Sequence, residues 1–239
     1  GETDGHPMAQ DWRDVSAGRF VPYLEKIDKG IRDKDSRAVK VVAMLSYSVS
    51  KIMMYNSLGQ LTEDCRPLGS ISITTVFQQN GMTETKSVSR SLRMGVEMLT
   101  DDVAKDLIDR AVAHIDERFA AKRPKGGKMK VVMGAGASGI LLHEAMGHAF
   151  EADFNRKGQS IFADRMGKRI CMKGINILDD ATIPGNRGSL NYDDEGVAGQ
   201  KTCMVTDGVL TSYLHDRISA GWYGVAPTGN GRRESFRYN

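Results

Sequence analysis

The apolar positions of the chain follow first a helical and then a strand-like pattern. Residues 20–32, FVPYLEKIDKGIR, carry apolar side chains at helical spacing and predict a helix. Between Val39 and Arg90 the sequence is rich in β-branched residues that alternate in places with polar ones. Turn sequences at Ser57–Gly59 and Gln79–Gly81 divide this stretch, so we expect three to five antiparallel strands.

A second helical pattern occupies residues 99–122, LTDDVAKDLIDRAVAHIDERFAAK. The acidic first turn after Thr100 complements the helix dipole. His114 lies beside the apolar stripe and is expected at the helix surface or boundary. The stripe itself predicts one long amphipathic helix and consists of Val103, Leu107, Ile108, Ala111 and Ile115.

The last part of the chain has shorter and less regular patterns. The basic segment 122–130, KRPKGGKMK, predicts a solvated linker. The sequence MKVVMGAG that overlaps its end predicts a short buried strand, which leads into Ser138, the expected N-cap of the next helix. Strand patterns return at residues 169–178 and 200–216, the second with an Asp207-Gly208 hairpin signal.

Helical and strand patterns thus occur in separate blocks, which favours an α+β fold over a parallel βαβ fold. We expect antiparallel β-sheets, a long amphipathic helix and a separate helix that carries the motif described below. The expected organisation is an N-terminal helical or connecting segment (1–37), a β-rich region with the long helix (38–121) and a motif-bearing region (122–239).

Composition and charge exclude several classes of protein. The chain has 239 residues, 40% hydrophobic and 26% charged, which is typical of a soluble globular protein with one large or two small domains. It contains no apolar run of about 18 residues, so no segment is expected to span a membrane. A net charge of +3 is too small to indicate nucleic-acid binding.

The three cysteines, Cys65, Cys171 and Cys203, argue against a disulfide framework and against a cysteine-based zinc ribbon. Their number is odd and none belongs to a C-x-x-C motif. We therefore expect a reducing, cytoplasmic compartment.

The candidate chemistry lies in the sequence GAGASGILLHEAMGHAFEADF, where His143 and Glu144 are followed by His148. In the zinc-protease motif H-E-x-x-H both imidazoles share one helical face. Here the spacing is one residue longer, and an i, i+5 pair on a regular α-helix is offset by roughly 140°. A π-bulge or a helix break near Gly147 would bring the two rings together, so Gly147 is expected to accommodate the geometry.

Two interpretations of this motif remain open on spacing alone. In the functional one, His143 and His148 are neutral imidazole ligands of Zn²⁺ and Glu144 is the general base that takes a proton from water. In the structural one, a glycine-containing core helix carries two boundary histidines and a surface glutamate.

The segment that contains the motif is followed along the chain by three other distinctive segments. The four segments are GILLHEAMGHAFEADFNRKGQSIF, NRGSLNYDDEGVAGQ, TDGVLTSYLHDR and PTGNGRRESF. Together they resemble the TldD/PmbA family, also named modulators of DNA gyrase, over Phe20 to Phe236. The H-E-x-x-x-H motif is similar to that of the TldD branch.

The resemblance implies a zinc metallopeptidase that acts on unfolded or flexible peptides. In such a family member the residues matching His143 and His148 bind zinc and the one matching Glu144 is catalytic. The active site faces an enclosed lumen, where an extended peptide pairs with strand edges through its backbone. The resemblance also implies a homodimer, or a heterodimer with a homologue that lacks the motif.

Two features of the family have no match in this sequence. The family's third zinc ligand is a cysteine in a glycine-rich C-terminal segment, and a further α/β portion precedes the region matching Gly1. We therefore expect the chain to be the central part of a family member. Because catalytic zinc usually has three protein ligands, we expect this chain alone to bind zinc weakly or not at all and to be inactive. Glu151, Asp153 and His215 remain open as substitute ligands.

The glycine-rich end supplies further candidates. Asn230, Arg232 and Arg233 are expected substrate contacts, since arginine can hold a carboxylate or carbonyl through two donors, but structural ion pairs explain the arginines equally well. The acidic cluster from Asp193 to Glu195 is interpreted either as a solvated turn or as a loop that lines the peptide channel. A non-catalytic peptide-binding or interaction subunit, like the motif-less branch of the family, is the alternative function.

Overall fold

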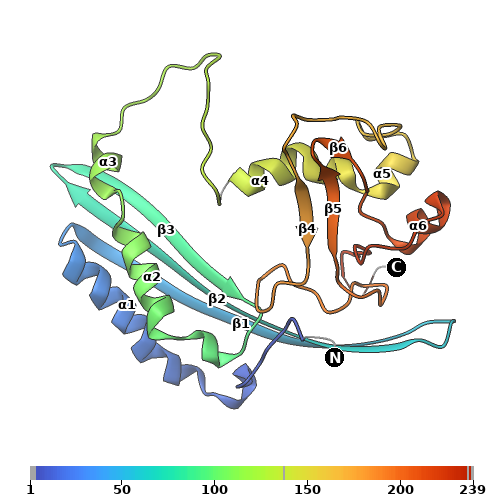
Figure 1. Cartoon of the computed structure of the whole chain (residues 1–239). Helices are drawn as coiled ribbons and strands as arrows, with labels where there is room; N and C mark the ends of the chain where they lie inside the picture. Colours follow the sequence, from blue (N-terminus) through green and yellow to red (C-terminus); the bar gives the residue numbers. More distant parts are fainter. Residues whose placement is uncertain (1–3, 137, 236, 238–239) are drawn as a thin grey trace. The chain divides into compact units, whose positions relative to one another are not determined.

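The computed structural model describes residues 4–136, 138–235 and 237, and the chain forms two compact units (Figure 1). Unit 1 comprises Gly1–Lys51, Cys65–Gly127 and Pro184–Arg187. Unit 2 comprises Ile52–Asp64, Lys128–Ile183 and Gly188–Asn239. Both units are discontinuous in sequence.

Unit 1 is built on a three-stranded sheet with the order β1-β2-β3. The strands are β1 (Ala38–Tyr55), β2 (Leu61–Gln79) and β3 (Met82–Leu92), and the far ends of β1 and β2 belong to unit 2. The turn between β2 and β3 is Asn80-Gly81, where both residues have positive φ (51° and 77°), as a type I′ hairpin turn requires. The expected antiparallel strands are therefore confirmed, at three in number.

Two helices cover one face of this sheet, α1 (Val21–Lys34) and α2 (Asp101–Val112) (Figure 1). In the part of β2 that belongs to unit 1, every second residue from Ile71 to Phe77 is fully buried, as the period of a strand dictates. Ile71, Ile73 and Phe77 belong to the same core cluster as residues of the two helices. Trp12, in the short helix η1 (Trp12–Asp14), stacks on Tyr47 with 5.0 Å between ring centroids. The core of unit 1 includes Ile27, Ile31, Ile71, Ile73, Phe77, Leu107 and Ala111.

The prediction of one long helix over residues 99–122 is wrong, because two helices occupy this region. They are α2 (Asp101–Val112) and α3 (Ile115–Ala120), separated by His114 in the left-handed conformation (φ 58°). Thr100 caps α2 with its side chain, which accepts a hydrogen bond from the backbone N–H of Val103. His114 is exposed, as expected.

Tertiary contacts explain the break. Lys86 of β3 donates a hydrogen bond to the carbonyl of Ala113, which a continuous helix would use internally. Past the break, Ile115 is buried in the core, and Arg118 donates to the carbonyl of Thr85. The chain therefore turns to follow β3 instead of continuing straight.

Unit 2 contains a smaller sheet with the order β4-β5-β6. Its strands are β4 (Ile177–Asp180), β5 (Lys201–Thr206) and β6 (Val209–Leu210), all antiparallel to their neighbours. The Asp207-Gly208 hairpin is confirmed, with positive φ at both residues. The core of this unit contains Phe150, Ala152, Phe162, Ile177, Met204, Val205, Leu210 and Tyr213.

The remaining helices are short. In unit 1 they are η2 (Ala17–Phe20) and η3 (Val96–Met98). In unit 2 they are α4 (Ser138–Leu142), η4 (His143–Gly147), η5 (His148–Phe150), α5 (Ala152–Arg156) and α6 (Arg217–Tyr223). The α+β class with antiparallel sheets is confirmed. In the described part of the chain, no helix is both long and apolar enough to cross a bilayer.

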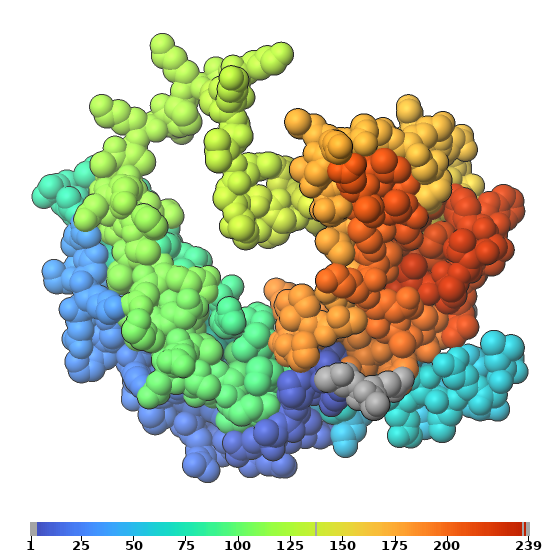
Figure 2. Space-filling model, in the orientation of Figure 1, coloured from blue at the N-terminus to red at the C-terminus, as the bar shows by residue number. Residues whose placement is uncertain are grey.

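The segment before α4 differs from its prediction as a buried strand. Residues 128–136 form no strand, and their side chains stand out into solvent (Figure 2). Val132 is 99% exposed. Among the described residues no strand pairs with this segment, and an isolated extended segment cannot satisfy its backbone groups as a sheet does. Ser138 is the first residue of α4 instead of its N-cap, and its hydroxyl donates to the carbonyl of Gly134.

Candidate metal centre

The motif lies on a helical run whose central turn is a π-helix, His143–Gly147. Leu142 before it and His148 after it keep right-handed helical torsions, with φ of −61° and −62°. A π-turn takes up one residue more than an α-turn, so it removes the angular offset that the i, i+5 spacing would otherwise produce. Of the two expected devices, the π-bulge is therefore confirmed, and the helix does not break at Gly147.

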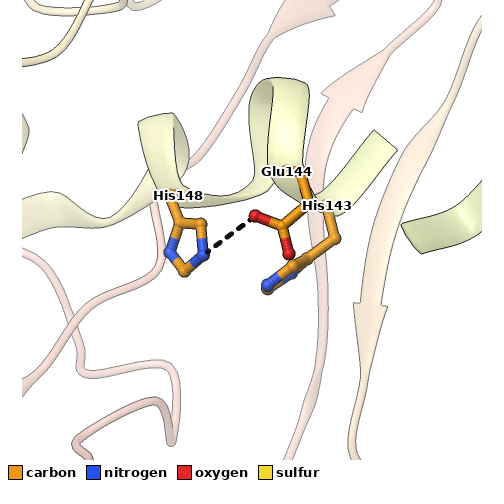
Figure 3. A group of neighbouring side chains, drawn as sticks. All are labelled: His143, Glu144 and His148. Atoms are coloured by element: carbon orange, nitrogen blue, oxygen red, sulfur yellow. Dashed lines mark ion pairs between the residues drawn. The ribbon is translucent and has the colours of Figure 1, made fainter. Parts of the chain in front are cut away.

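The π-turn brings the three polar side chains of the motif together. His143, Glu144 and His148 project from the same side of the helix (Figure 3), and each offers a ligand atom within 4.8 Å of the others. The two imidazole rings have centroids 4.5 Å apart at an interplanar angle of 62°. Nε2 of His148 lies 4.0 Å from Oε2 of Glu144.

Gly147 accommodates this geometry through space and not through unusual torsions. Its φ of −56° is ordinary for a helix. A Cβ atom at this position would lie 3.1 Å from Nδ1 of His143, closer than side chains normally approach. The glycine therefore leaves room for the imidazole of His143 on the helix surface.

Glu151 holds the second histidine from outside the motif. Its Oε1 lies 2.6 Å from Nδ1 of His148. This hydrogen bond is the main cause that raises the pKa of His148 above its usual value. Nδ1 is thereby engaged, and Nε2 is the nitrogen that faces Glu144.

The other two residues considered as substitute ligands lie elsewhere. Asp153 pairs with Lys157 at 3.3 Å, and His215 is buried between Tyr213 and Tyr223. Burial lowers the pKa of His215, because it disfavours the charged imidazolium. In the part of the chain that the structure describes, neither residue belongs to the ligand group of His143, Glu144 and His148.

The side chains of this group are of types that can bind zinc. Two imidazoles and a carboxylate are ligands that Zn²⁺ accepts in proteins. The group that the described residues form contains no cysteine, and Sγ of Cys203 instead bonds to the carbonyl of Val205. All three side chains of the group are exposed. Thus only two histidines are available as ligands if Glu144 is kept as a base.

A hollow of about 230 Å³ lies beside the motif within unit 2. Its walls are mostly apolar, with His143 and Glu151 on the helical side and Asp179 at the end of β4. β4 is an edge strand of its sheet. The apolar part of the lining includes Leu142, Phe150, Ile177, Leu178, Met204 and Leu214.

The expected substrate contacts take different places. Asn230 donates from Nδ2 to Oδ2 of Asp179 at 2.9 Å, so it supports a residue of the hollow beside His143. Arg232 has its Nε 3.5 Å from Oδ2 of Asp194. Arg233 donates its backbone N–H to Asp194 and lines a second hollow of about 330 Å³.

The acidic cluster is not a solvated turn at Asp193, which is fully buried. Its carboxylate accepts three backbone hydrogen bonds, from the N–H groups of Glu195, Val197 and Gly231. Asp193 therefore fixes the loop that leads to Asn230, a role that its position in an acidic run of the sequence did not indicate. Burial also raises the pKa of Glu195.

Comparisons with known proteins agree on one family. The profile of the PmbA/TldA metallopeptidase central domain matches residues 10–115, and that of the PmbA/TldA metallopeptidase C-terminal domain matches residues 126–239. The chain is 38% identical over 225 residues to a metalloprotease TldD homologue of Haemophilus influenzae, covering 91% of this chain and 46% of that protein. It is 33% identical over 169 residues to a zinc metalloprotease TldD homologue of Saccharolobus solfataricus, covering 70% of this chain and 38% of that one.

Solved structures share the fold. A protein of Thermotoga maritima described as a putative modulator of a DNA gyrase aligns with a TM-score of 0.77 at 21% identity, over 100% of this chain and 54% of that one. TldE from Thermococcus kodakarensis aligns with a TM-score of 0.77 at 22% identity, over 94% of this chain and 50% of that one. The chain spans about half the length of the relatives that it matches.

Proposed function

This chain belongs to the PmbA/TldD metallopeptidase family, and we propose on that basis that it carries the catalytic centre of a zinc-dependent peptidase. One observation carries the proposal: a π-turn gathers the ligand atoms of His143, Glu144 and His148 within 4.8 Å of one another. π-turns are rare in proteins and occur frequently at functional sites, so a π-turn that gathers two histidines and a glutamate favours a chemical role.

Each residue of the centre has a separate role. His143 and His148, as neutral imidazoles, are the residues that would hold Zn²⁺. When bound, the ion supplies polarisation of the scissile carbonyl and activation of water. Glu144 is the general base that accepts the proton of the attacking water and passes it to the leaving amine.

The surroundings of the centre favour an extended peptide as substrate. The edge of β4 offers backbone groups for pairing with a peptide main chain, beside an apolar hollow large enough for a side chain. Recognition of the main chain suits unfolded or flexible peptides of varied sequence. Asn230 is proposed to act on the substrate indirectly, by holding Asp179 in the wall of the hollow. Arg232 and Arg233 are proposed to contact the peptide substrate directly.

The working form is proposed to be a cytoplasmic homodimer, or a heterodimer with a homologue that lacks the motif. The similarity to a protein named TldE supports the second possibility. Among the described residues, the ligand group of His143, Glu144 and His148 offers only two imidazoles besides the proposed base. Catalytic zinc usually has three protein ligands, so we expect the 239-residue chain alone to hold zinc weakly and to be inactive.

Substitution of Glu144 tests the roles directly. In the full-length protein, Glu144→Gln is expected to retain zinc and to lose about 10²–10⁴-fold in kcat, the range of general-base catalysis. His143→Ala and His148→Ala are expected to lose zinc as well. Zinc per chain and hydrolysis of an unstructured peptide are measured for each variant. Full activity of Glu144→Gln would exclude Glu144 as the base, and full zinc content of both histidine variants would exclude this centre.

A non-catalytic, peptide-binding subunit is the alternative function. The exposure of all three side chains of the group and the absence of a third ligand besides Glu144 among the described residues favour it. Peptide binding without zinc-dependent cleavage by the full-length protein would support this alternative over the peptidase.

A further inference from the structure

Glu151 lies three residues after His148 and outside the H-E-x-x-x-H motif. Its carboxylate oxygen is 2.6 Å from Nδ1 of His148, which is a short, well-formed hydrogen bond. A carboxylate can only accept here, so Nδ1 of the neutral imidazole carries the proton. The lone pair of the ring is then on Nε2, the nitrogen that faces Glu144 at 4.0 Å.

The backbone of Glu151 is fixed on both sides. Leu214 donates its N–H to the carbonyl of Phe150 and accepts from the N–H of Ala152, both at 2.9 Å. These two bonds flank Glu151 and form a parallel bridge to Leu214. Phe150 and Ala152 are themselves buried in the core of unit 2.

A buried amide adds a second anchor to the same turn. Nδ2 of Asn155 donates to the carbonyls of Ala149 and Glu151, at 2.8 Å each. Ser160 donates its hydroxyl to the carbonyl of Ala149 as well, at 2.7 Å. Asn155 is 4% exposed, so these bonds are shielded from water. The carboxylate of Glu151 is therefore presented from a rigid turn, while His148 itself lies on an exposed helix surface.

We propose that Glu151 is a positioning residue that holds His148 in the Nδ1–H tautomer, with Nε2 directed at the candidate metal centre. The proposal extends the function proposed above, since a fixed tautomer and ring orientation are what a histidine ligand requires. Glu151 is not in the group of described residues whose ligand atoms cluster, and its Oε1 is engaged on the far nitrogen of the ring.

The tautomer can be measured without any metal. The full chain is labelled with ¹⁵N-histidine, and long-range ¹H–¹⁵N correlation spectra assign the protonated nitrogen of each of the five histidines at a pH where the rings are neutral. His148 is expected to be protonated on Nδ1 in the wild-type protein and to shift toward Nε2–H in Glu151→Ala. Glu151→Gln, which keeps an acceptor oxygen but no charge, is expected between the two.

Asp153→Ala is the matched control, because Asp153 is a carboxylate two residues away that pairs with Lys157 and not with His148. It is expected to leave the His148 signals unchanged. Protonation of His148 on Nε2 in the wild-type protein, or the same tautomer in wild type and Glu151→Ala, would overturn the proposal.

Competition between the full-length protein and a chelator for Zn²⁺ provides the second readout. Loss of an outer-shell partner typically weakens metal binding about 10–100-fold, and this range is expected for Glu151→Ala but not for Asp153→Ala. Equal zinc affinity in wild type and Glu151→Ala, with loss in His148→Ala, would contradict the positioning role. A tautomer shift in a full-length protein that binds no zinc would instead support the role of Glu151 and count against the proposed metal centre.

Discussion

Unit 1 and unit 2 are stabilised in different ways. Unit 1 has long strands and two amphipathic helices around an apolar core, so its structure follows from the periodicity of its sequence. Unit 2 has short strands, long loops and a set of buried polar side chains that hold those loops, and it also carries the candidate centre. The buried polar residues of unit 2 include Asn155, Ser189, Asp193, Thr202, His215 and Ser219. The difference suggests that apolar volume limits the stability of unit 1, whereas particular hydrogen bonds limit that of unit 2.

The largest effect is expected from a cavity in unit 1. Phe77 is fully buried on β2, and Phe77→Ala is expected to lower the free energy of unfolding by about 3–5 kcal/mol, through lost burial and the cavity that remains. Val76→Ala, on the opposite face of the same strand and only partly buried, is the control and should cost less than half as much. Urea denaturation measures both. Equal costs at the two positions would show that β2 does not bury one face as described.

Loss of one carboxylate in unit 2 should have the next largest effect. Asp193→Asn replaces an oxygen that accepts from a backbone N–H, so one buried donor is left unpaired or faces an amide group. A cost of about 2–3 kcal/mol is expected, since hydrogen bonds to charged groups are among the stronger ones. Asp153→Asn at the surface should change stability little. If Asp193→Asn were as mild as the surface control, unit 2 would not depend on its buried polar contacts.

The sequence predicts the features that depend on local pattern, but not those that depend on particular tertiary hydrogen bonds. In unit 1 the strands, the Asn80-Gly81 turn and the helix at residues 20–32 follow from local pattern. The break at His114 does not, because it depends on Lys86 reaching the carbonyl of Ala113 from another strand. A tertiary contact of this kind leaves no trace in periodicity.

In the candidate metal centre, the backbone geometry could be predicted from the sequence, but the contact of Glu151 could not. The spacing of His143 and His148 was sufficient to predict either a π-bulge or a break, and to single out Gly147. The hydrogen bond that His148 donates to Glu151 could not be foreseen, because side-chain positions after a π-turn do not follow the α-helical period. The i, i+3 interval between the two residues was the only signal in the sequence.

Gly147 offers a way to separate the stability of unit 2 from the geometry of its centre. Gly147→Ala should gain up to about 1 kcal/mol of helix propensity, offset in part by the 3.1 Å approach to His143. The zinc affinity of the full-length protein is nevertheless expected to fall several-fold, because the ring of His143 must move. Gly139→Ala on α4 is the matched control, since its added Cβ meets nothing within 4 Å. Unchanged zinc affinity in Gly147→Ala would show that the glycine is not needed for the ring.

The smallest effect should be a change in how the stability of unit 2 depends on pH. His215 is buried against Tyr213 and Tyr223, and its Nδ1 has no hydrogen-bond partner among the described residues. Burial lowers its pKa below the ordinary value near 6.5. Between the lowered folded pKa and 6.5 the unfolded chain binds a proton that the folded chain does not. The contribution of His215 is therefore complete above about pH 6.5 and is lost as the pH falls through the folded pKa.

His215→Phe keeps an aromatic ring in the cluster and removes this titration. The difference in unfolding midpoint between wild type and His215→Phe is expected to be constant above about pH 7 and to shift against the wild type as the pH falls toward 5. Glu195 acts in the opposite direction, because its raised pKa favours the folded state at low pH, but it is present in both proteins and cancels in the difference. A difference that stays constant over the whole range would mean that His215 is protonated as readily in the folded chain as in the unfolded one. In that case the buried polar groups of unit 2 would not be as shielded from water as their packing indicates.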